Sequence, residues 1–367
     1  MAEDSNMHHH ISGFGRTVVS SAALALVLTA CSTSGSGGGD GSGGGGGADS
    51  SSKGAKGESS PSAGVISLKS AQGVLLNYAK VNNQANAAQD PKKIAEVESG
   101  ALLQQSQATF TQFTALPKKE QASYEVPFYY PVKGAHFYIP RKGSESVFWA
   151  DTRVTGKNIA KDRRRLIAFK HVKGGEGAAW KAVAVGELDD KLPEIQRDGD
   201  GFASVLKASD TVGKTKLDDL RGWSQDFYVT GGKNAGSTFA DTAAVKDWKK
   251  EYTNRADFPD GCVDGKYNPG RTAAETVYGL KTADGGAVAL YDFGVDYVNW
   301  PKTDGLQCES VMRIDNMPAV TDIYLDGRTT STILTRSDSL LTMAVVPPSG
   351  KRVRVTGYSF QLINAKG

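Results

Sequence analysis

A glycine- and serine-rich tract from Ser32 to Gly64 decides which part of this 367-residue chain can fold. The tract carries almost no apolar side chains, so it cannot bury enough surface to offset the entropy lost on ordering. We expect a flexible coil with a mean end-to-end reach of roughly 30 Å. The folded region is therefore confined to residues 65–367, which is long enough for two domains of ordinary size.

The segment that precedes the tract is apolar but short. It runs from Thr17 to Leu28 and follows Arg16. A membrane-spanning helix needs about 20 apolar residues, so this stretch is too short to span a bilayer stably. A basic residue followed by a short apolar run and small residues is typical of a secretory signal peptide. We therefore expect residues 1–30 to be removed on export.

The residues at the end of this segment indicate a lipid attachment site. The order Leu28, Thr29, Ala30, Cys31 resembles the bacterial lipobox, in which cleavage before the cysteine follows lipidation of its thiol. The resemblance implies that Cys31 is the first mature residue, and that acyl chains on it tether the chain to the lipid bilayer. Residues 31–64 would then be a spacer at the extracellular face of the cell membrane. The alternative is a simple secretory signal with a chance cysteine.

Two further cysteines, Cys262 and Cys308, remain in the folded region. In an exported, oxidising setting an even pair is typical of a disulfide bond. We therefore predict a Cys262–Cys308 bridge, the alternative being two buried free thiols. The formal net charge of +3 at pH 7 is too small to indicate nucleic acid as a partner.

The folded region begins with helical periodicity. Asp90 followed by Pro91 is typical of a helix start, and we expect the helix that follows to bury Ile94 and Val97. Another helix is expected between residues 101 and 113. A further helix is expected before Asp90, with its apolar positions at Leu68, Ala71, Leu75, Tyr78, Val81 or Asn82, and Ala85. The apolar positions of the helix between residues 101 and 113 are Leu102, Leu103, Phe110 and Phe113.

Strand patterns follow these helices. The segments are short, rich in β-branched and aromatic residues, and separated by Gly, Lys and Pro: SYEVPFYYPV, AHFYIP, SVFWADTRV, RRLIAFKHV and AAWKAVAVGEL. Helices followed by an antiparallel meander predict an α+β fold in which helices cover one face of a curved sheet.

The second half of the folded region repeats this order. Two helical patterns come first, with Leu217, Leu220, Trp223 and Phe227 in one, and Val245, Trp248 and Tyr252 in the other. Two hairpin patterns follow, ETVYGLKTADGGAVALYDFGVDYV with the turn dipeptide Asp284-Gly285, and LLTMAVVPPSGKRVRVTGYSFQL. The sequence therefore predicts two tandem α+β units, residues 65–195 and 196–367.

Two resemblances follow from these patterns. Helices followed by a bent antiparallel sheet resemble the cone-shaped folds of the nuclear-transport-factor-2-like superfamily, which implies a pocket between helix and sheet. The segment VLLNYAKVNNQANAAQDPKKIAEVESGALLQQS, followed by a long β-rich region, resembles secreted lipoproteins of streptomycete-type actinobacteria. The globular part of those lipoproteins has no assigned function, so the resemblance implies no catalytic residues.

An aromatic-rich region offers the first candidate binding site. Strand alternation places Phe128 and Tyr130 on one side and Tyr129 on the other, so one aromatic face is free to line a pocket. The alternative is an ordinary core with a capped edge. The candidate pocket residues are Tyr129, Tyr130, His136, Tyr138 and Trp149.

A basic window offers the second candidate site. It contains Lys161, Arg163, Arg164, Arg165 and Lys170. Such a cluster would attract anionic lipid headgroups or cell-wall polymers. The alternative is a solvated hairpin face whose arginines are paired with Asp151 or Asp162.

Signals for catalysis or metal binding are weak. Zinc sites usually need three or four closely spaced His or Cys ligands, and only His136 and His171 follow Cys31. No G-x-S-x-G pentapeptide occurs in residues 65–367. Asp292 and Asp296 alternate with apolar neighbours, so we expect them on the solvent face of a strand. We therefore predict no catalytic residue, no metal site and no cofactor.

Three functions stay open at this point. We favour a non-catalytic surface lipoprotein that binds a small molecule, a cell-wall component or another envelope protein. A secreted hydrolase would instead use a carboxylate pair, or His171 with a nearby acid. A structural or assembly protein would dock on the membrane or wall through its basic window.

Overall fold

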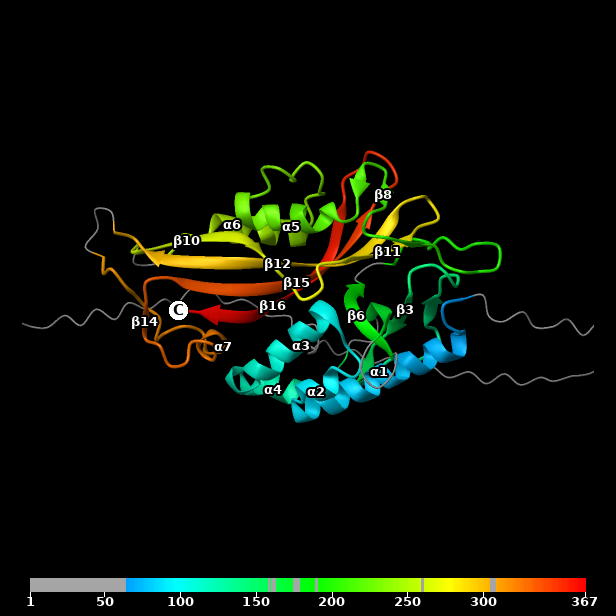
Figure 1. The fold of residues 1–367 in the computed structure, drawn as a ribbon, viewed down its shortest axis with the longest axis horizontal. Coiled ribbons are helices and arrows are strands. Elements are labelled where there is room, and N and C mark those ends of the chain that lie inside the picture. Colours follow the sequence, from blue (N-terminus) through cyan, green and yellow to red (C-terminus); the bar gives the residue numbers. More distant parts are fainter. Residues whose placement is uncertain are drawn as a thin grey trace, which may run out of the picture.

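The computed structural model describes residues 64–157, 159, 163–173, 179–188, 191–258, 261–303 and 308–367. The expected signal peptide, Cys31, the glycine-rich tract and Lys161 lie outside these residues. The described chain is α+β, as predicted, and its sheets are antiparallel. Its layers run from helices through two stacked sheets to a second group of helices (Figure 1).

The first helices form at the predicted positions. They are α1 (Leu68–Ala88), α2 (Pro91–Ile94), α3 (Gly100–Gln112) and α4 (Lys118–Tyr124), with a 3₁₀ turn, η1 (Phe113–Ala115), between the last two. The Asp90 side chain caps α2 by accepting hydrogen bonds from the backbone N–H groups of Lys92 and Lys93. Ile94 and Val97 are buried, as expected, but α2 ends at Ile94, so Val97 lies beyond the helix that was expected to carry it. Leu68 on α1 is exposed.

The first sheet contains four strands in the order β2-β3-β5-β6. Their bounds are β2 (His136–Tyr138), β3 (Val147–Arg153), β5 (Arg164–Val172) and β6 (Ala179–Leu188). One face packs on α1, where the rings of Tyr78 and Phe169 meet edge to face at 5.6 Å. The other face meets the second sheet so closely that a Cβ atom on Gly186 would lie 2.8 Å from Leu290.

The expected strand over residues 123–132 is mostly wrong. Tyr124 ends α4, and only β1 (Phe128–Tyr129) is a strand, pairing with β4 (Thr155–Gly156). Pro127 and Pro131 flank β1, and proline lacks the N–H group that a longer ladder would need.

The second sheet contains six strands and is built from long hairpins. Its strands are β7 (Val205–Leu206), β10 (Val263–Gly270), β11 (Val277–Lys281), β12 (Ala287–Pro301), β15 (Leu334–Val346) and β16 (Arg354–Lys366). Their order is β16-β15-β12-β11-β7, and β10 also pairs with β12. Both predicted hairpins are present, and the turn between β11 and β12 contains Asp284 and Gly285 as expected. Gly285 has a φ of 86°, which favours glycine.

The outer face of this sheet is covered by α5 (Asp219–Thr230) and α6 (Ala243–Thr253) (Figure 1). Phe227 and Trp248 pack there with Phe293 of β12. The remaining short elements are β8 (Thr211–Val212), β9 (Thr215–Lys216), β13 (Met312–Arg313), α7 (Ala319–Asp322) and β14 (Thr330–Ser331). The disulfide Cys262–Cys308 is present, with a Cα–Cα distance of 5.4 Å.

The two sequence halves share a hydrophobic core. One buried cluster joins Trp149 and Ile167 of the first sheet to Leu290, Leu341 and other residues of the second. Buried polar contacts cross the same boundary, because Gln105 Nε2 on α3 donates to the Ser339 carbonyl at 2.9 Å. The helices of the first half thus pack against strands of the second, while the boundary between residues 195 and 196 stays a prediction.

Candidate ligand-binding site

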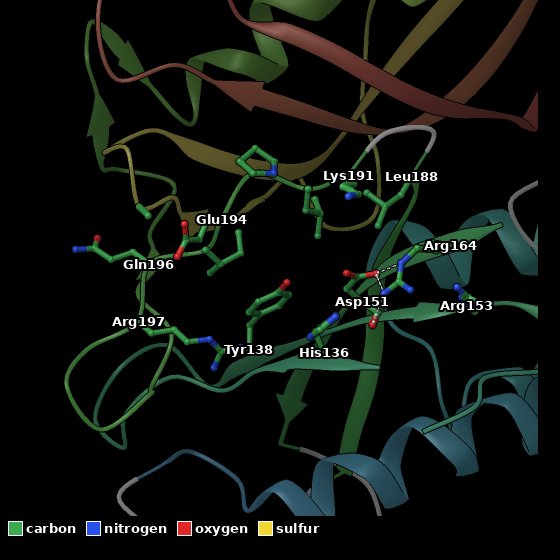
Figure 2. A pocket seen from close by; sticks show the side chains of 14 residues that line it. His136, Tyr138, Asp151, Arg153, Arg164, Leu188, Lys191, Glu194, Gln196 and Arg197 are labelled. Atoms are coloured by element: carbon green, nitrogen blue, oxygen red, sulfur yellow. Dashed lines mark hydrogen bonds and ion pairs between the residues drawn. The ribbon is translucent and has the colours of Figure 1, made fainter. Parts of the chain in front are cut away.

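A cavity of about 830 Å³ opens at one end of the contact between the two sheets (Figure 2). One wall comes from β2, β3 and β5 of the first sheet. The opposite wall is residues 191–197, which follow the first sheet, together with Ala283 in the β11–β12 turn. A cavity of this volume is in the range of small-molecule sites in proteins.

Strand register explains why polar side chains gather in this cavity. His136 of β2 lies opposite Asp151 of β3, and Arg153 of β3 lies opposite Arg164 of β5. Alternate residues of a strand share one face, so His136 and Tyr138 point the same way, as do Asp151 and Arg153. This is the face that meets the second sheet, and the polar groups lie where the contact opens to solvent (Figure 2).

Two of the cations in the cavity are held by described partners. An ion pair of 2.7 Å joins Arg164 to the Asp151 carboxylate. Arg197 donates to the carbonyl of Phe137 at 3.0 Å, and its guanidinium lies 5.0 Å from the centre of the Tyr138 ring. These contacts fix the walls of the cavity.

Two other cations in the cavity lack such partners. Arg153 and Lys191 are exposed and form no hydrogen bond or ion pair with any described residue. The described acidic residues of the lining are Asp151, which is already paired with Arg164, and Glu194. The described lining therefore has a surplus of positive charge that can attract an anion.

The Tyr138 hydroxyl adds a neutral hydrogen-bonding group. Burial, reinforced by the negative charge of Asp151, raises the pKa of Tyr138 to about 12. The phenol stays protonated at neutral pH, so it can donate to a ligand oxygen. Among the described residues, no group of three or more His, Cys, Asp or Glu side chains is placed to hold a metal ion.

The five aromatic and histidine residues expected to share one pocket are separated by the structure. His136 and Tyr138 line the large cavity. Tyr130 is only 1% exposed and packs under α1 against Tyr78, so its assignment to a pocket is corrected. Tyr129 is 58% exposed, because it faces away from that core on β1. Trp149 is buried at the sheet contact and borders a different cavity.

The basic window is not a patch of free charges, which corrects the second candidate site. Arg165 is only 2% exposed, donates to the Tyr130 hydroxyl at 3.0 Å and pairs with Glu187 at 3.2 Å. Arg163 also pairs with Glu187, at 2.5 Å, and Arg164 pairs with Asp151. The alternative interpretation, in which the arginines pair with Asp151 or Asp162, is correct for Arg164 and Asp151, whereas the partner of Arg163 and Arg165 is Glu187, which it did not name. Lys170 remains exposed, and Lys161 lies outside the described residues.

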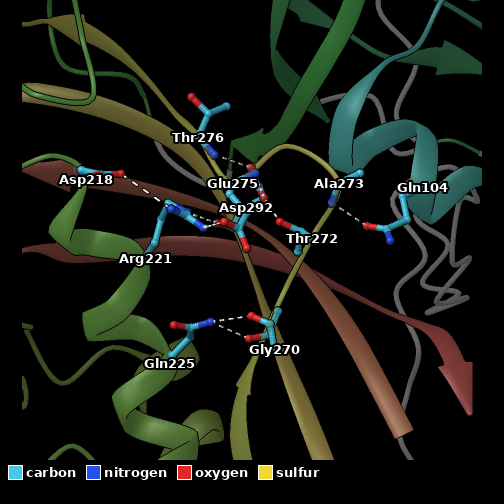
Figure 3. Close-up of polar contacts among 11 residues, drawn as sticks. Gln104, Asp218, Arg221, Gln225, Gly270, Thr272, Ala273, Glu275, Thr276 and Asp292 are labelled. Atoms are coloured by element: carbon cyan, nitrogen blue, oxygen red, sulfur yellow. Dashed lines mark hydrogen bonds and ion pairs between the residues drawn. The ribbon is translucent and has the colours of Figure 1, made fainter. Parts of the chain in front are cut away.

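The expectation that Asp292 faces solvent is wrong. Strand β12 is buried on both faces, so Asp292 is only 2% exposed despite the alternating pattern. Its carboxylate accepts hydrogen bonds from the Thr272 hydroxyl and from the backbone N–H groups of Glu275 and Thr276, at 3.0 and 3.2 Å (Figure 3). Burial raises the pKa of this carboxyl. Asp292 therefore fastens the β10–β11 loop to the sheet.

The groups weighed for a hydrolase do not form one site. The imidazole ring of His171 lies on β5 and packs against Trp180 at 5.1 Å. Asp292 is engaged by the β10–β11 loop, and neither residue lines the large cavity. Within the described part of the chain, no hydrogen bond or ion pair joins His171 to Asp292 or Asp296.

Sequence reasoning missed Arg153, Lys191 and the segment 191–197. Arg153 lay just outside the basic window, and the segment carries no strand or helix pattern. A clue was available in the alternation of β3, because Asp151 and Arg153 follow Trp149 on one face. None of the described helices is long and apolar enough to cross a membrane.

Comparison with known proteins identifies a family and a relative, neither of which has an assigned function. A family described as a domain of unknown function, DUF8094, matches residues 62–367. An uncharacterized lipoprotein of Streptomyces coelicolor is 30% identical over 312 residues, covering 83% of each chain. The predicted resemblance to streptomycete lipoproteins without an assigned function is confirmed. No solved structure matches the chain significantly, and the nuclear-transport-factor-2-like resemblance stays a prediction.

Proposed function

The chain belongs to the DUF8094 family, and from that premise we propose that it is a surface lipoprotein that binds an anionic small molecule or cell-wall component. The binding site is the cavity of about 830 Å³ between the two sheets. The observation that carries the proposal is the presence in that cavity of Arg153 and Lys191, two cations without a described partner.

The chemistry of the cavity favours a ligand with both an acid group and hydroxyl groups. Arg153 and Lys191 supply charge, and Arg presents planar paired donors that suit a carboxylate or phosphate. The Tyr138 hydroxyl and the Gln196 amide, which also line the cavity, suit neutral oxygen atoms. A phosphorylated or carboxylated sugar has this composition, and both occur as units of charged wall polymers.

The proposed location rests on the N-terminal segment and on the relative. Lipidation of Cys31 would anchor the chain in the bilayer at the extracellular face of the cell membrane. The tract from Ser32 to Gly64 would hold the folded part about 30 Å from the anchor. The relative from Streptomyces coelicolor carries the name lipoprotein, which supports the anchor.

The test is native mass spectrometry on the full chain extracted from the envelope of its producing cell. We expect an adduct that survives native ionisation and disappears under denaturing conditions. Arg153→Ser combined with Lys191→Ser should remove the adduct, because the two cations would hold the acid group.

Lys246→Ser combined with Lys249→Ser on α6 is the matched control, since it removes the same charge on the outer helix layer. An adduct of unchanged intensity in the cavity variant would contradict the proposal. So would a bare mass for the wild-type chain.

A further inference from the structure

A second cavity, of about 400 Å³, lies at the sheet contact away from the site described above. The first sheet contributes Val147 and Trp149 of β3 and Lys170 of β5. The second half contributes β7, the start of β11, and the turn that leads into the β8–β9 pair. The two cavities have no lining residue in common.

One side of this cavity is apolar. Val147, Trp149 and Val277 are buried members of the protein core that border it. Tyr278 borders it as well, and burial raises the pKa of its hydroxyl, so that group is neutral. The indole Nε1 of Trp149 is buried and has no acceptor among the described residues. An apolar wall of this size can cover an aromatic ring or a short alkyl group.

The other side of the cavity is basic. Lys170, Lys207 and Lys216 border it from three separate segments, and all three are exposed. None of them forms an ion pair or hydrogen bond through its ammonium group with a described residue. The described acidic residues at the cavity are Glu145 and Asp218. The Asp218 carboxylate already forms an ion pair with the Arg221 guanidinium, at an N–O distance of 3.7 Å.

From this arrangement we propose that the second cavity is a binding site for a small amphipathic anion. Its apolar body would lie against Val205, Leu206 and Ala208, which are the more accessible apolar residues of the lining, and its acid group would lie among Lys170, Lys207 and Lys216. The site differs from the first cavity in chemistry, because the first is lined by polar groups on both walls. A ligand here would contact both sheets and so stabilise their packing.

The test uses 2-naphthoate as the probe and 2-naphthamide as its uncharged isostere. Binding to the full chain in a nonionic detergent is measured by equilibrium dialysis, with detergent alone as background. We expect saturable binding of one naphthoate per chain, weakened by added salt, and at least about tenfold weaker binding of the amide.

Three sets of variants locate the site. Lys170→Gln, Lys207→Gln and Lys216→Gln together should weaken naphthoate binding about tenfold. The matched triple variant on α6, Lys246→Gln, Lys249→Gln and Lys250→Gln, should bind naphthoate like the wild type. The pair Arg153→Ser and Lys191→Ser should also bind it normally, which keeps this inference separate from the proposed function.

Each remaining outcome overturns the inference. Equal binding of naphthoate and naphthamide would show that the lysines do not hold the acid group. The absence of saturable binding would show that the cavity is not a binding site for such an anion. Loss of binding in the Arg153 and Lys191 pair, with no loss in the lysine triple variant, would assign the probe to the first cavity.

Discussion

The buried carboxyl of Glu98 should make the unfolding free energy depend on pH, by an amount that follows from its pKa. Glu98 is 1% exposed and lies between α2 and α3, beside strand β6. Its oxygens accept hydrogen bonds from the Tyr78 hydroxyl at 3.0 Å, the Asn82 amide at 3.0 Å and the Ser106 hydroxyl at 2.6 Å. No described cation pairs with it, and burial raises its pKa from 4.5 to about 7 despite these three hydrogen bonds.

The direction of the effect follows from proton linkage. Below about pH 4.5 the carboxyl is protonated in both the folded and the unfolded chain, so it imposes no penalty. Between pH 4.5 and 7 the unfolded chain loses the proton while the folded chain keeps it, and stability falls. A rise in the pKa from 4.5 to about 7 corresponds to a loss of roughly 3 kcal/mol of stability, complete above pH 7.

Glu98→Gln isolates this contribution. The amide oxygen still accepts from Tyr78 and Asn82, and the amide N–H₂ group can donate to Ser106, but the side chain no longer ionises. We expect the unfolding free energy of the variant, relative to wild type, to rise by about 3 kcal/mol between pH 4 and pH 8. Urea titrations at each pH measure this difference, and the titration of other groups cancels in it.

Two results would refute the reasoning about Glu98. A difference between variant and wild type that stays constant within about 0.5 kcal/mol across this range would show an ordinary carboxyl pKa. A difference that falls as pH rises would show that the folded chain stabilises the ionised form.

Three further changes test the packing. Trp248→Ala should lower the unfolding free energy in urea by about 3 to 5 kcal/mol, because Trp248 is fully buried among the rings of α5, β12 and β16; a loss below about 1 kcal/mol would contradict that packing. Cys262→Ser with Cys308→Ser should lower the unfolding free energy by about 2 to 4 kcal/mol, while the intact mass of the wild type should rise by two hydrogens on reduction. Gly285→Val should lower the melting temperature, since a φ of 86° is strained for a β-branched residue, and an unchanged melting curve would place that turn in another conformation.

Local features of the fold were predictable from the sequence. The apolar spacing from Ala71 to Ala85 produces α1, and Asp284 with Gly285 produces the turn between β11 and β12. In both cases the signal lies within one element or one turn, where side-chain period and backbone preference act over a few residues. The disulfide follows from the composition of the chain.

The packing of layers on both faces of each sheet was not predictable, and the errors come from it. Alternation marked Asp292 as a surface residue, but β12 is covered by α5 and α6 on one face and by the first half of the chain on the other. Charge spacing marked Arg165 as part of a surface patch, but Arg165 pairs with Glu187 and is buried beside Tyr130 on the face of the first sheet that packs on α1. In both cases, contacts between segments far apart in the sequence determine whether the side chain is buried.

The candidate cavity was predictable only in part, for the same reason. His136 and Tyr138 were identified from aromatic density on one sheet. Arg153 and Lys191 become site residues only when segment 191–197 closes over the edge of the first sheet. No local sequence pattern predicts that segment 191–197 packs over this edge.

The central claim is that the large cavity between the sheets holds an anionic ligand. A crystal structure of the full chain purified from its own envelope tests this most directly. We expect electron density for a ligand in the cavity, with an acid group within hydrogen-bond distance of Arg153 or Lys191. A cavity filled by the protein's own side chains, or a ligand that contacts neither cation, would contradict the claim.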